Sequence, residues 1–136
     1  MTTLESDSVS INKPAEEVYN FLGDFRNFEK LMPPQVVDWK ATSEECSFTI
    51  QGMMSIGMKF KQKIPNSLLE IERNGKAPVD FILRCMITGQ QRCDVKLEFD
   101  ADLNPMMKML AQRPLTNFLN LLTAKLQDLF ATGKTV

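Results

Sequence analysis

The feature that most constrains the fold is an alternation of polar and apolar residues with a period of two. It is clearest in 93–102, where Cys93, Val95 and Leu97 interleave with charged residues. Such alternation predicts strands with one buried and one solvated face. The segments with this pattern are 38–41, 46–50, 54–64, 69–72, 79–88 and 93–102. Because the joints between them are short, we expect an antiparallel meander, with a tight hairpin turn at Asn74-Gly75.

The N-terminal part predicts one strand followed by two short helices. Residues 3–11 are rich in Ser, Thr and Val, and Pro14 follows them at a position suited to a helix start. Apolar residues recur at helical spacing in 14–23 and again in 25–32, before Pro33-Pro34 ends the helical pattern. We therefore expect both helices between the first and second strands.

The C-terminal part predicts a long amphipathic helix from 105 to about 132. Pro114 lies inside it and should kink the helix or divide it in two, because proline lacks a backbone donor. Ala131-Thr132-Gly133 is expected to end it.

These elements predict an α+β fold in one domain, residues 1–136. An antiparallel sheet of about seven strands twists and curls, and the long helix is the natural cover for its apolar concave face. A curved sheet wrapped around one helix leaves an apolar gap, which is the usual setting for a small hydrophobic ligand.

The stretch from Val9 to Met32 reads VSINKPAEEVYNFLGDFRNFEKLM. Its strand, its Pro-Ala-Glu-Glu-Val segment, the aspartate that follows and the short helix ending at proline resemble the START-like helix-grip (SRPBCC) superfamily. This superfamily also contains plant pollen-allergen relatives, polyketide cyclases and coenzyme Q-binding proteins, and the order of elements extends the resemblance to nearly the whole chain. The resemblance implies the helix-grip fold and a lipid, hormone or quinone-like ligand. It does not choose between binding and catalysis, since some members cyclise or hydroxylate their ligands.

The candidate cavity residues are apolar residues at the alternate strand positions that are expected to face the helix, together with apolar residues of the helix. They are Trp39, Phe48, Ile50, Met54, Ile56, Met58, Leu69, Ile71, Phe81, Leu83, Val95 and Leu97 from the strands, and Met107, Leu110 and Phe118 from the helix. For each of them, ordinary core packing is the alternative interpretation. Methionine favours a cavity wall slightly, because flexible thioethers suit surfaces that adapt to different partners.

Two features of the predicted strand 54–64 leave alternatives open. A bulge at Gly57 would turn Met58 and Phe60 to the face opposite Met54 and Ile56. The lysines at 59, 61 and 63 form a row that is either a lipid-headgroup site or, more commonly, a solvated strand face neutralised by Glu70 and Glu72.

Composition excludes several classes of function. Sixteen basic and seventeen acidic residues give a net charge of −1, so no sequence-wide field favours nucleic acid or anionic membranes. Histidine is absent, and Cys46, Cys85 and Cys93 lack metal-site spacing, so we expect buried reduced thiols, no metal and no cofactor. With no signal sequence and no integral membrane segment expected, the prediction is a cytoplasmic monomer or homodimer.

Three functions compete. The scarcity of inward ionisable groups favours a non-catalytic carrier or sensor for a small hydrophobic molecule over a polyketide cyclase or dehydratase-like enzyme. A protein-interaction module is the third possibility, since Ile82 and Met86 interrupt the polar outer face. A cavity below about 300 Å³ would fall short of the usual ligand site and would leave mainly the interaction function.

Overall fold

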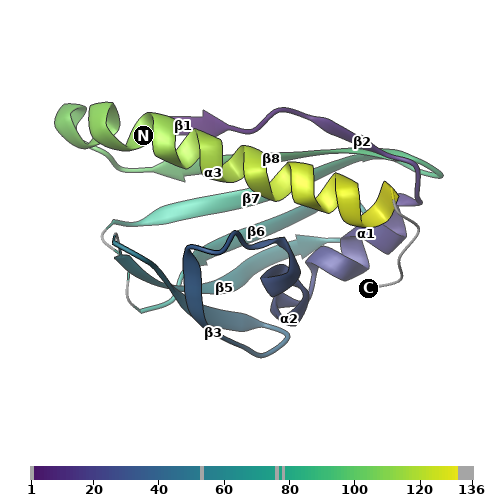
Figure 1. Cartoon of the computed structure of the whole chain (residues 1–136). Helices are drawn as coiled ribbons and strands as arrows, with labels where there is room; N and C mark the ends of the chain where they lie inside the picture. Colours follow the sequence, from purple (N-terminus) through teal and green to yellow (C-terminus); the bar gives the residue numbers. More distant parts are fainter. Residues whose placement is uncertain (1, 53, 76, 78, 132–136) are drawn as a thin grey trace.

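The structure is a computed structural model that describes residues 2–52, 54–75, 77 and 79–131. In these residues, eight strands form one antiparallel sheet in the order β1-β8-β7-β6-β5-β4-β3, with β2 also paired to β8 (Figure 1). The strands are β1 (Thr2–Glu5), β2 (Val9–Ile11), β3 (Val36–Ala41), β4 (Glu45–Ile50), β5 (Met54–Ile64), β6 (Leu68–Arg73), β7 (Phe81–Gly89) and β8 (Cys93–Ala101). The helices are α1 (Ala15–Leu22), α2 (Phe25–Phe28), the 3-10 turn η1 (Glu29–Leu31) and α3 (Pro105–Ala131).

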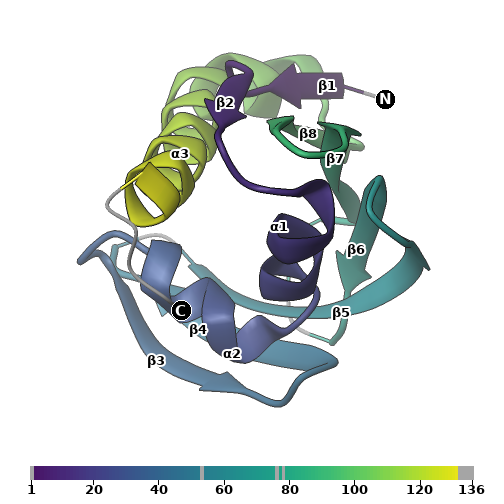
Figure 2. The same cartoon turned by 90° about the vertical axis from the view of Figure 1, so that its right-hand side faces the viewer.

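The sheet curls around the helices, as Figure 2 shows in a view into its concave side. The long helix α3 lies across the concave face, and α1 and α2 lie near the C-terminal end of α3 (Figure 1). This arrangement confirms the predicted α+β helix grip. Within the described residues, no helix combines the length and the hydropathy needed to cross a bilayer.

The first predicted strand is divided into β1 and β2, so the sheet has one strand more than expected and the short helices follow the second strand. Glu5 pairs with Glu98 and Val9 pairs with Val95, which leaves three residues opposite two. Ser6 fills the break: its amide donates to the carbonyl of Leu97, and its hydroxyl accepts from the Leu97 amide, both at 2.9 Å. The break is therefore closed by hydrogen bonds despite the lost ladder pairing.

The strand β5 changes register at Lys61 and not at Gly57. Gly57 pairs regularly with Ser47, whereas Phe60 pairs with Ile71 and Gln62 with Glu70, so Lys61 is the extra residue of a bulge. The predicted lysine row is broken because Lys63 turns to the corner between α1 and α2. There its ammonium donates to the carbonyl of Gly23 at 3.2 Å and pairs with Glu44 at 2.9 Å.

Two further expectations differ from the structure. The chain between β6 and β7 is a connection from Asn74 to Asp80 and not a tight turn, although Gly75 has the positive φ of +81° that favours glycine. The helix α3 continues through Pro114 without dividing. Its predicted end at Thr132-Gly133 lies outside the described residues.

A row of charged side chains crosses the outer face of the sheet. Arg84 on β7 pairs with Glu70 at 2.8 Å and Glu98 at 2.9 Å on the two neighbouring strands, and it also binds Asp100. Hydrogen bonds to Asp100 and Glu70 raise the pKa of the Arg84 guanidinium. Hydrogen bonds from the Thr3 hydroxyl and from Arg84 lower the pKa of Asp100 below its ordinary 3.8. Arg84 therefore holds three carboxylates together across three strands.

We expect Arg84→Leu to lower the free energy of unfolding by about 1 to 3 kcal/mol at pH 7, because it leaves three half-buried carboxylates without their cation. A group whose pKa is lowered by folding stabilises the protein above its unfolded pKa and loses that effect as the pH falls through its folded pKa. The difference between wild type and variant should therefore shrink below about pH 4, as urea melts at pH 7 and pH 3 would measure. As a control, Arg73→Leu removes an exposed pair with Asp80 and should cost less than about 0.5 kcal/mol. Equal losses for the two variants would contradict the assigned role of Arg84.

Candidate functional site

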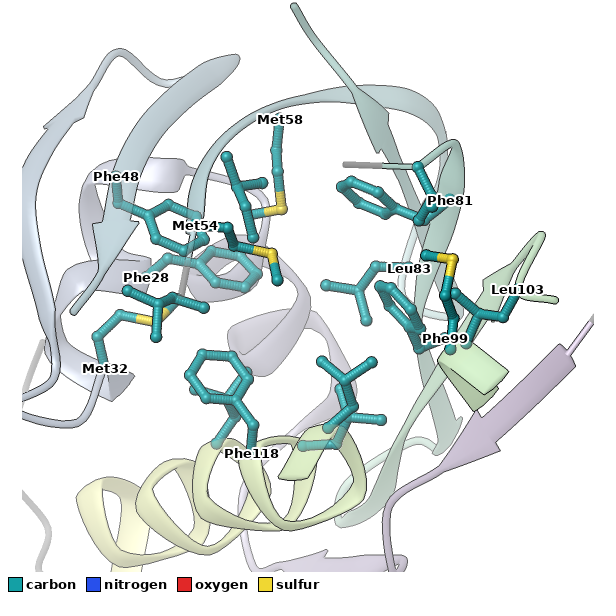
Figure 3. A pocket seen from close by; sticks show the side chains of 17 residues that line it. Phe28, Met32, Phe48, Met54, Met58, Phe81, Leu83, Phe99, Leu103 and Phe118 are labelled. Atoms are coloured by element: carbon teal, nitrogen blue, oxygen red, sulfur yellow. The ribbon is translucent and has the colours of Figure 1, made fainter. Parts of the chain in front are cut away.

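An apolar cavity of about 180 Å³ lies between the concave face of the sheet and the helix α3. Its wall in the described residues is made of 17 side chains, all of them apolar (Figure 3). They are Phe28, Met32, Phe48, Ile50, Met54, Ile56, Met58, Val79, Phe81, Leu83, Phe99, Leu103, Met107, Leu115, Phe118, Leu119 and Leu122. The volume is below the limit of about 300 Å³ set for a usual ligand site.

Aromatic rings and thioethers are interspersed on the cavity wall. Met54 and Met58 extend from β5 toward its centre, with Phe48 and Phe28 beside them, while Phe118 rises from α3 on the opposite wall (Figure 3). Four of the wall residues are methionines, namely Met32, Met54, Met58 and Met107. These unbranched side chains can change rotamer more readily than the branched residues around them, so the wall is deformable.

Nine of the fifteen predicted cavity residues lie on this wall: Phe48, Ile50, Met54, Ile56, Met58, Phe81, Leu83, Met107 and Phe118. The regular pairing of Gly57 keeps Met54, Ile56 and Met58 on one face, which answers the question about a bulge there. The remaining six predicted residues lie elsewhere for three different reasons.

Four of the six are core residues in the part of the concave face that α1 covers. Leu69, Ile71, Val95 and Leu97 are all at most 4% exposed and do not line the cavity. The helix α1 contacts β6 and β7 there, and Phe21 of α1 meets Phe130 of α3 edge to face with ring centroids 5.5 Å apart. The helix α1 therefore covers the half of the concave face that these four residues occupy.

Trp39 lies behind the wall and does not line it. Its ring stacks on Phe48 with centroids 5.1 Å apart, and its indole Nε1 is buried without a hydrogen-bond partner among the described residues. The strand β3 is an edge of the sheet with a register shift between Val37 and Lys40. That irregularity places Trp39 outside the cavity while Phe48 separates it from the space.

Leu110 faces solvent, with 70% of its surface exposed. The wall residues of α3 are Met107, Leu115, Phe118, Leu119 and Leu122, which follow the helical period of 3.6 residues. Leu110 falls about a third of a turn away from the centre of that stripe, on the outer side. The prediction that it faces the sheet is wrong because a spacing of three residues drifts off the face when it is not alternated with four.

Eight wall residues were missed by sequence reasoning: Phe28, Met32, Val79, Phe99, Leu103, Leu115, Leu119 and Leu122. A signal existed for Phe99, which shares the inward parity of its strand, and for Leu115 and Leu122, which belong to the helical stripe. The others come from short helices, connections or the stripe's flank, where the direction of a side chain depends on tertiary packing.

The wall offers no group for acid–base chemistry, because none of its 17 described side chains is polar or ionisable. The described residues also contain no cluster of three or more side chains that could hold a metal ion. What the wall can supply is dispersion contact, aromatic stacking and sulfur–aromatic contact with an apolar molecule.

The cysteines are free and buried, as predicted. Burial raises the pKa of Cys46 and of Cys85 to about 12. Burial and the neighbouring Asp94 also raise the pKa of Cys93. Because the thiolate is the nucleophilic form, none of the three is prepared for nucleophilic catalysis.

We expect the native protein to react with dithiobis(nitrobenzoate) at pH 8 at least about a hundredfold more slowly than the urea-unfolded protein, which should release one equivalent per cysteine. The absorbance of the released thiolate measures both rates. A cysteine that reacts in the native protein as fast as free cysteine would contradict the burial described above.

Neither the protein-family models nor the curated proteins contain a match to this sequence. Solved structures do match. A START superfamily protein from Mycobacterium smegmatis has a TM-score of 0.71 at 14% identity, over 97% of this chain and 99% of its own. Norcoclaurine synthase from Thalictrum flavum, in complex with dopamine and hydroxybenzaldehyde, has a TM-score of 0.76 at 13% identity over 99% and 89%. The di-domain ARO/CYC BexL from the BE-7585A biosynthetic pathway has a TM-score of 0.72 at 15% identity over 94% of this chain and 46% of its own. At these identities the likeness is one of fold.

Proposed function

We propose that this chain, which has the START-like helix-grip fold, binds a small hydrophobic ligand of lipid, quinone or polyketide-like character in the cavity between its sheet and α3. The observation that carries the proposal is the wall itself, which presents only apolar side chains to a space of about 180 Å³. Binding, with no chemical step, is the activity that such a wall supports.

An empty space of this size is unfavourable for the folded protein. Side chains that line an unfilled space lose the dispersion contacts that a filled core would give them. An apolar occupant restores the lost dispersion contacts. The cavity is therefore a place where ligand binding and protein stability reinforce each other.

The volume limits the ligand. A dry cavity of about 150 Å³ lined by Leu, Ile and Phe is large enough for benzene, so the space described here accepts a molecule of about that size without rearrangement. A larger ligand requires the methionines to move outward, which their flexibility allows. Because the described wall side chains are all apolar and offer the ligand no hydrogen bond, polar groups of the ligand would have to remain at the cavity mouth.

The alternatives have less support. The enzyme alternative needs a carboxylate or arginine near the ligand, and the described wall contains neither. The interaction alternative was based on Ile82 and Met86, but both are half-buried on the outer face, beside the Arg84 row. The small volume remains the observation in favour of an interaction function, and the ligand experiments below distinguish the two.

Single-ring aromatics, short quinones and fatty acids should displace a fluorescent apolar probe from the protein, and compact molecules should bind without a lag because the cavity already fits them. Trp39 provides an internal readout, since it stacks on Phe48 of the wall and is the only tryptophan. Native mass spectrometry after mild purification would detect a ligand retained from the cell. A protein that is empty and binds no member of the panel would count against the proposal.

Leu83→Phe should weaken ligand binding by about tenfold or more, because the larger side chain enters the cavity from β7. Its stability should be equal or higher, since the ring fills the space that the ligand would occupy. The matched control is Ile82→Phe, which introduces the same ring in place of an aliphatic residue of equal size at the adjacent position, where the side chain points to the other face of the strand. If both variants bind as wild type does, the ligand does not lie in this cavity.

A further inference from the structure

Methionine is concentrated around the cavity. The described residues contain seven methionines, and four of them line the cavity wall: Met32, Met54, Met58 and Met107. Two more lie on the first turns of α3 beside Met107, namely Met106, which is 71% exposed, and Met109, which is 79% exposed. The seventh, Met86 on β7, lies on the outer face of the sheet. Most thioethers of the described residues are therefore at the proposed ligand site or next to it.

The four wall methionines differ in their access to solvent. Met58, in the middle of β5, is only 4% exposed. The other three are half-buried and lie where elements begin or end: Met54 is the first residue of β5, Met107 lies in the first turn of α3, and Met32 directly follows η1. The ends of strands and helices open more readily than their middles. A small solute therefore reaches these three thioethers without unfolding the protein, whereas Met58 requires a larger opening.

The cysteine thiols do not compete for an oxidant. Peroxides oxidise the thiolate form of cysteine, and Cys46, Cys85 and Cys93 are buried. Burial raises the pKa of all three thiols, which keeps them protonated. A thioether has no proton to lose, so its oxidation does not depend on ionisation. The accessible methionines are therefore the preferred targets.

The cavity wall cannot accommodate the product of methionine oxidation. Methionine sulfoxide is polar, and its oxygen needs a hydrogen-bond donor when it is buried. None of the 17 described wall side chains carries a donor. The sulfur atoms of Met54 and Met58, yellow in Figure 3, lie among aromatic and aliphatic side chains. A sulfoxide on this wall either turns out to water and removes part of the wall, or stays inside without a partner. Both outcomes weaken the binding of an apolar ligand.

We propose that hydroperoxides regulate the ligand site by oxidising Met32, Met54 and Met107 to methionine sulfoxide. This inference rests on the proposed ligand function, because binding is the activity that oxidation would switch off. The exposed Met106 and Met109 are oxidised as well, but they do not line the cavity and their oxidation leaves the wall intact.

The reaction needs no group other than the thioether and the peroxide. The sulfur lone pair attacks the terminal peroxide oxygen, the O–O bond breaks, and the proton of the transferred oxygen moves to the leaving oxygen. Sulfur is oxidised, and the peroxide is reduced to water or to an alcohol. Methionine sulfoxide reductases reverse the change. In that step a dithiol becomes a disulfide and the oxygen leaves as water.

Hydrogen peroxide and benzene test this regulation. Peroxide treatment of the wild-type protein should lower its affinity for benzene, measured by calorimetry, by at least about tenfold, because the sulfoxides have no partner on the wall. Tandem mass spectrometry should find Met32, Met54 and Met107 oxidised at least about tenfold faster than Met58. Treatment with the two methionine sulfoxide reductases, one for each sulfoxide epimer, and dithiothreitol should restore the affinity.

A triple leucine variant identifies the methionines responsible. Met32→Leu with Met54→Leu and Met107→Leu nearly conserves the volume and the apolar character of the wall. Its affinity before treatment serves as its own reference, and peroxide should change that affinity by less than about twofold because leucine has no sulfur to oxidise. The matched control, Met106→Leu with Met109→Leu, should bind benzene as wild type does and should lose affinity on oxidation as wild type does.

Several outcomes would overturn the regulation. Equal losses for the triple variant and the control would place the sensitive residue elsewhere. Circular dichroism that shows the oxidised wild type to be unfolded would mean that the whole fold, and not the wall, is lost. Wild-type protein that binds benzene equally well before and after oxidation would overturn this inference alone. Wild-type protein that binds no benzene before oxidation would overturn the proposed ligand function together with it.

Discussion

The packing of the C-terminal half of α3 into the concave face is the contact on which the rest of the structure depends. Leu119, Leu122, Leu126 and Phe130 are all at most 5% exposed, and the edge-to-face contact between Phe130 and Phe21 joins this half to α1. Burial of four large side chains on one stripe fixes the position of the helix on the sheet. Everything nearer the start of α3 is placed by this anchor.

The anchor divides the concave face into two unequal halves. In the half that α1 and α2 cover, aromatic rings fill the space: Phe25 stacks on Phe60 with ring centroids 4.3 Å apart and also contacts Phe28 at 5.3 Å. In the other half the helix α3 covers the sheet with side chains between Met107 and Leu122, Phe28 reaches the same space from α2, and side chains do not fill the interior completely. The cavity is thus the result of covering a long curved sheet with helices that are concentrated at one end.

The sequence predicted the repeating features of the fold and failed where a single residue altered them. The alternation in 93–102 appears in β8, where Val95 and Leu97 are buried between partly solvated neighbours. Periodicity could not predict the break at Ser6, because its hydrogen bonds to Leu97 depend on a strand 91 residues further along the chain. The alternation of apolar and polar residues predicted which face of each strand is buried. It could not distinguish Leu83, which lines the cavity, from Leu97, which lies in the filled core. That distinction depends on where α1 lies.

The bulge at Lys61 lets one strand serve both halves of the molecule. Before it, β5 directs Met54, Ile56 and Met58 to the cavity; after it, Lys63 reaches the carbonyl of Gly23 and lies 4.3 Å from the centre of the Phe60 ring. Without the extra residue, the second half would present the opposite set of side chains to the helical corner. The number of residues in β5 therefore determines which side chains face the helices as much as their identity does. A chain of this fold can vary the residues of that strand more freely than it can gain or lose one of them.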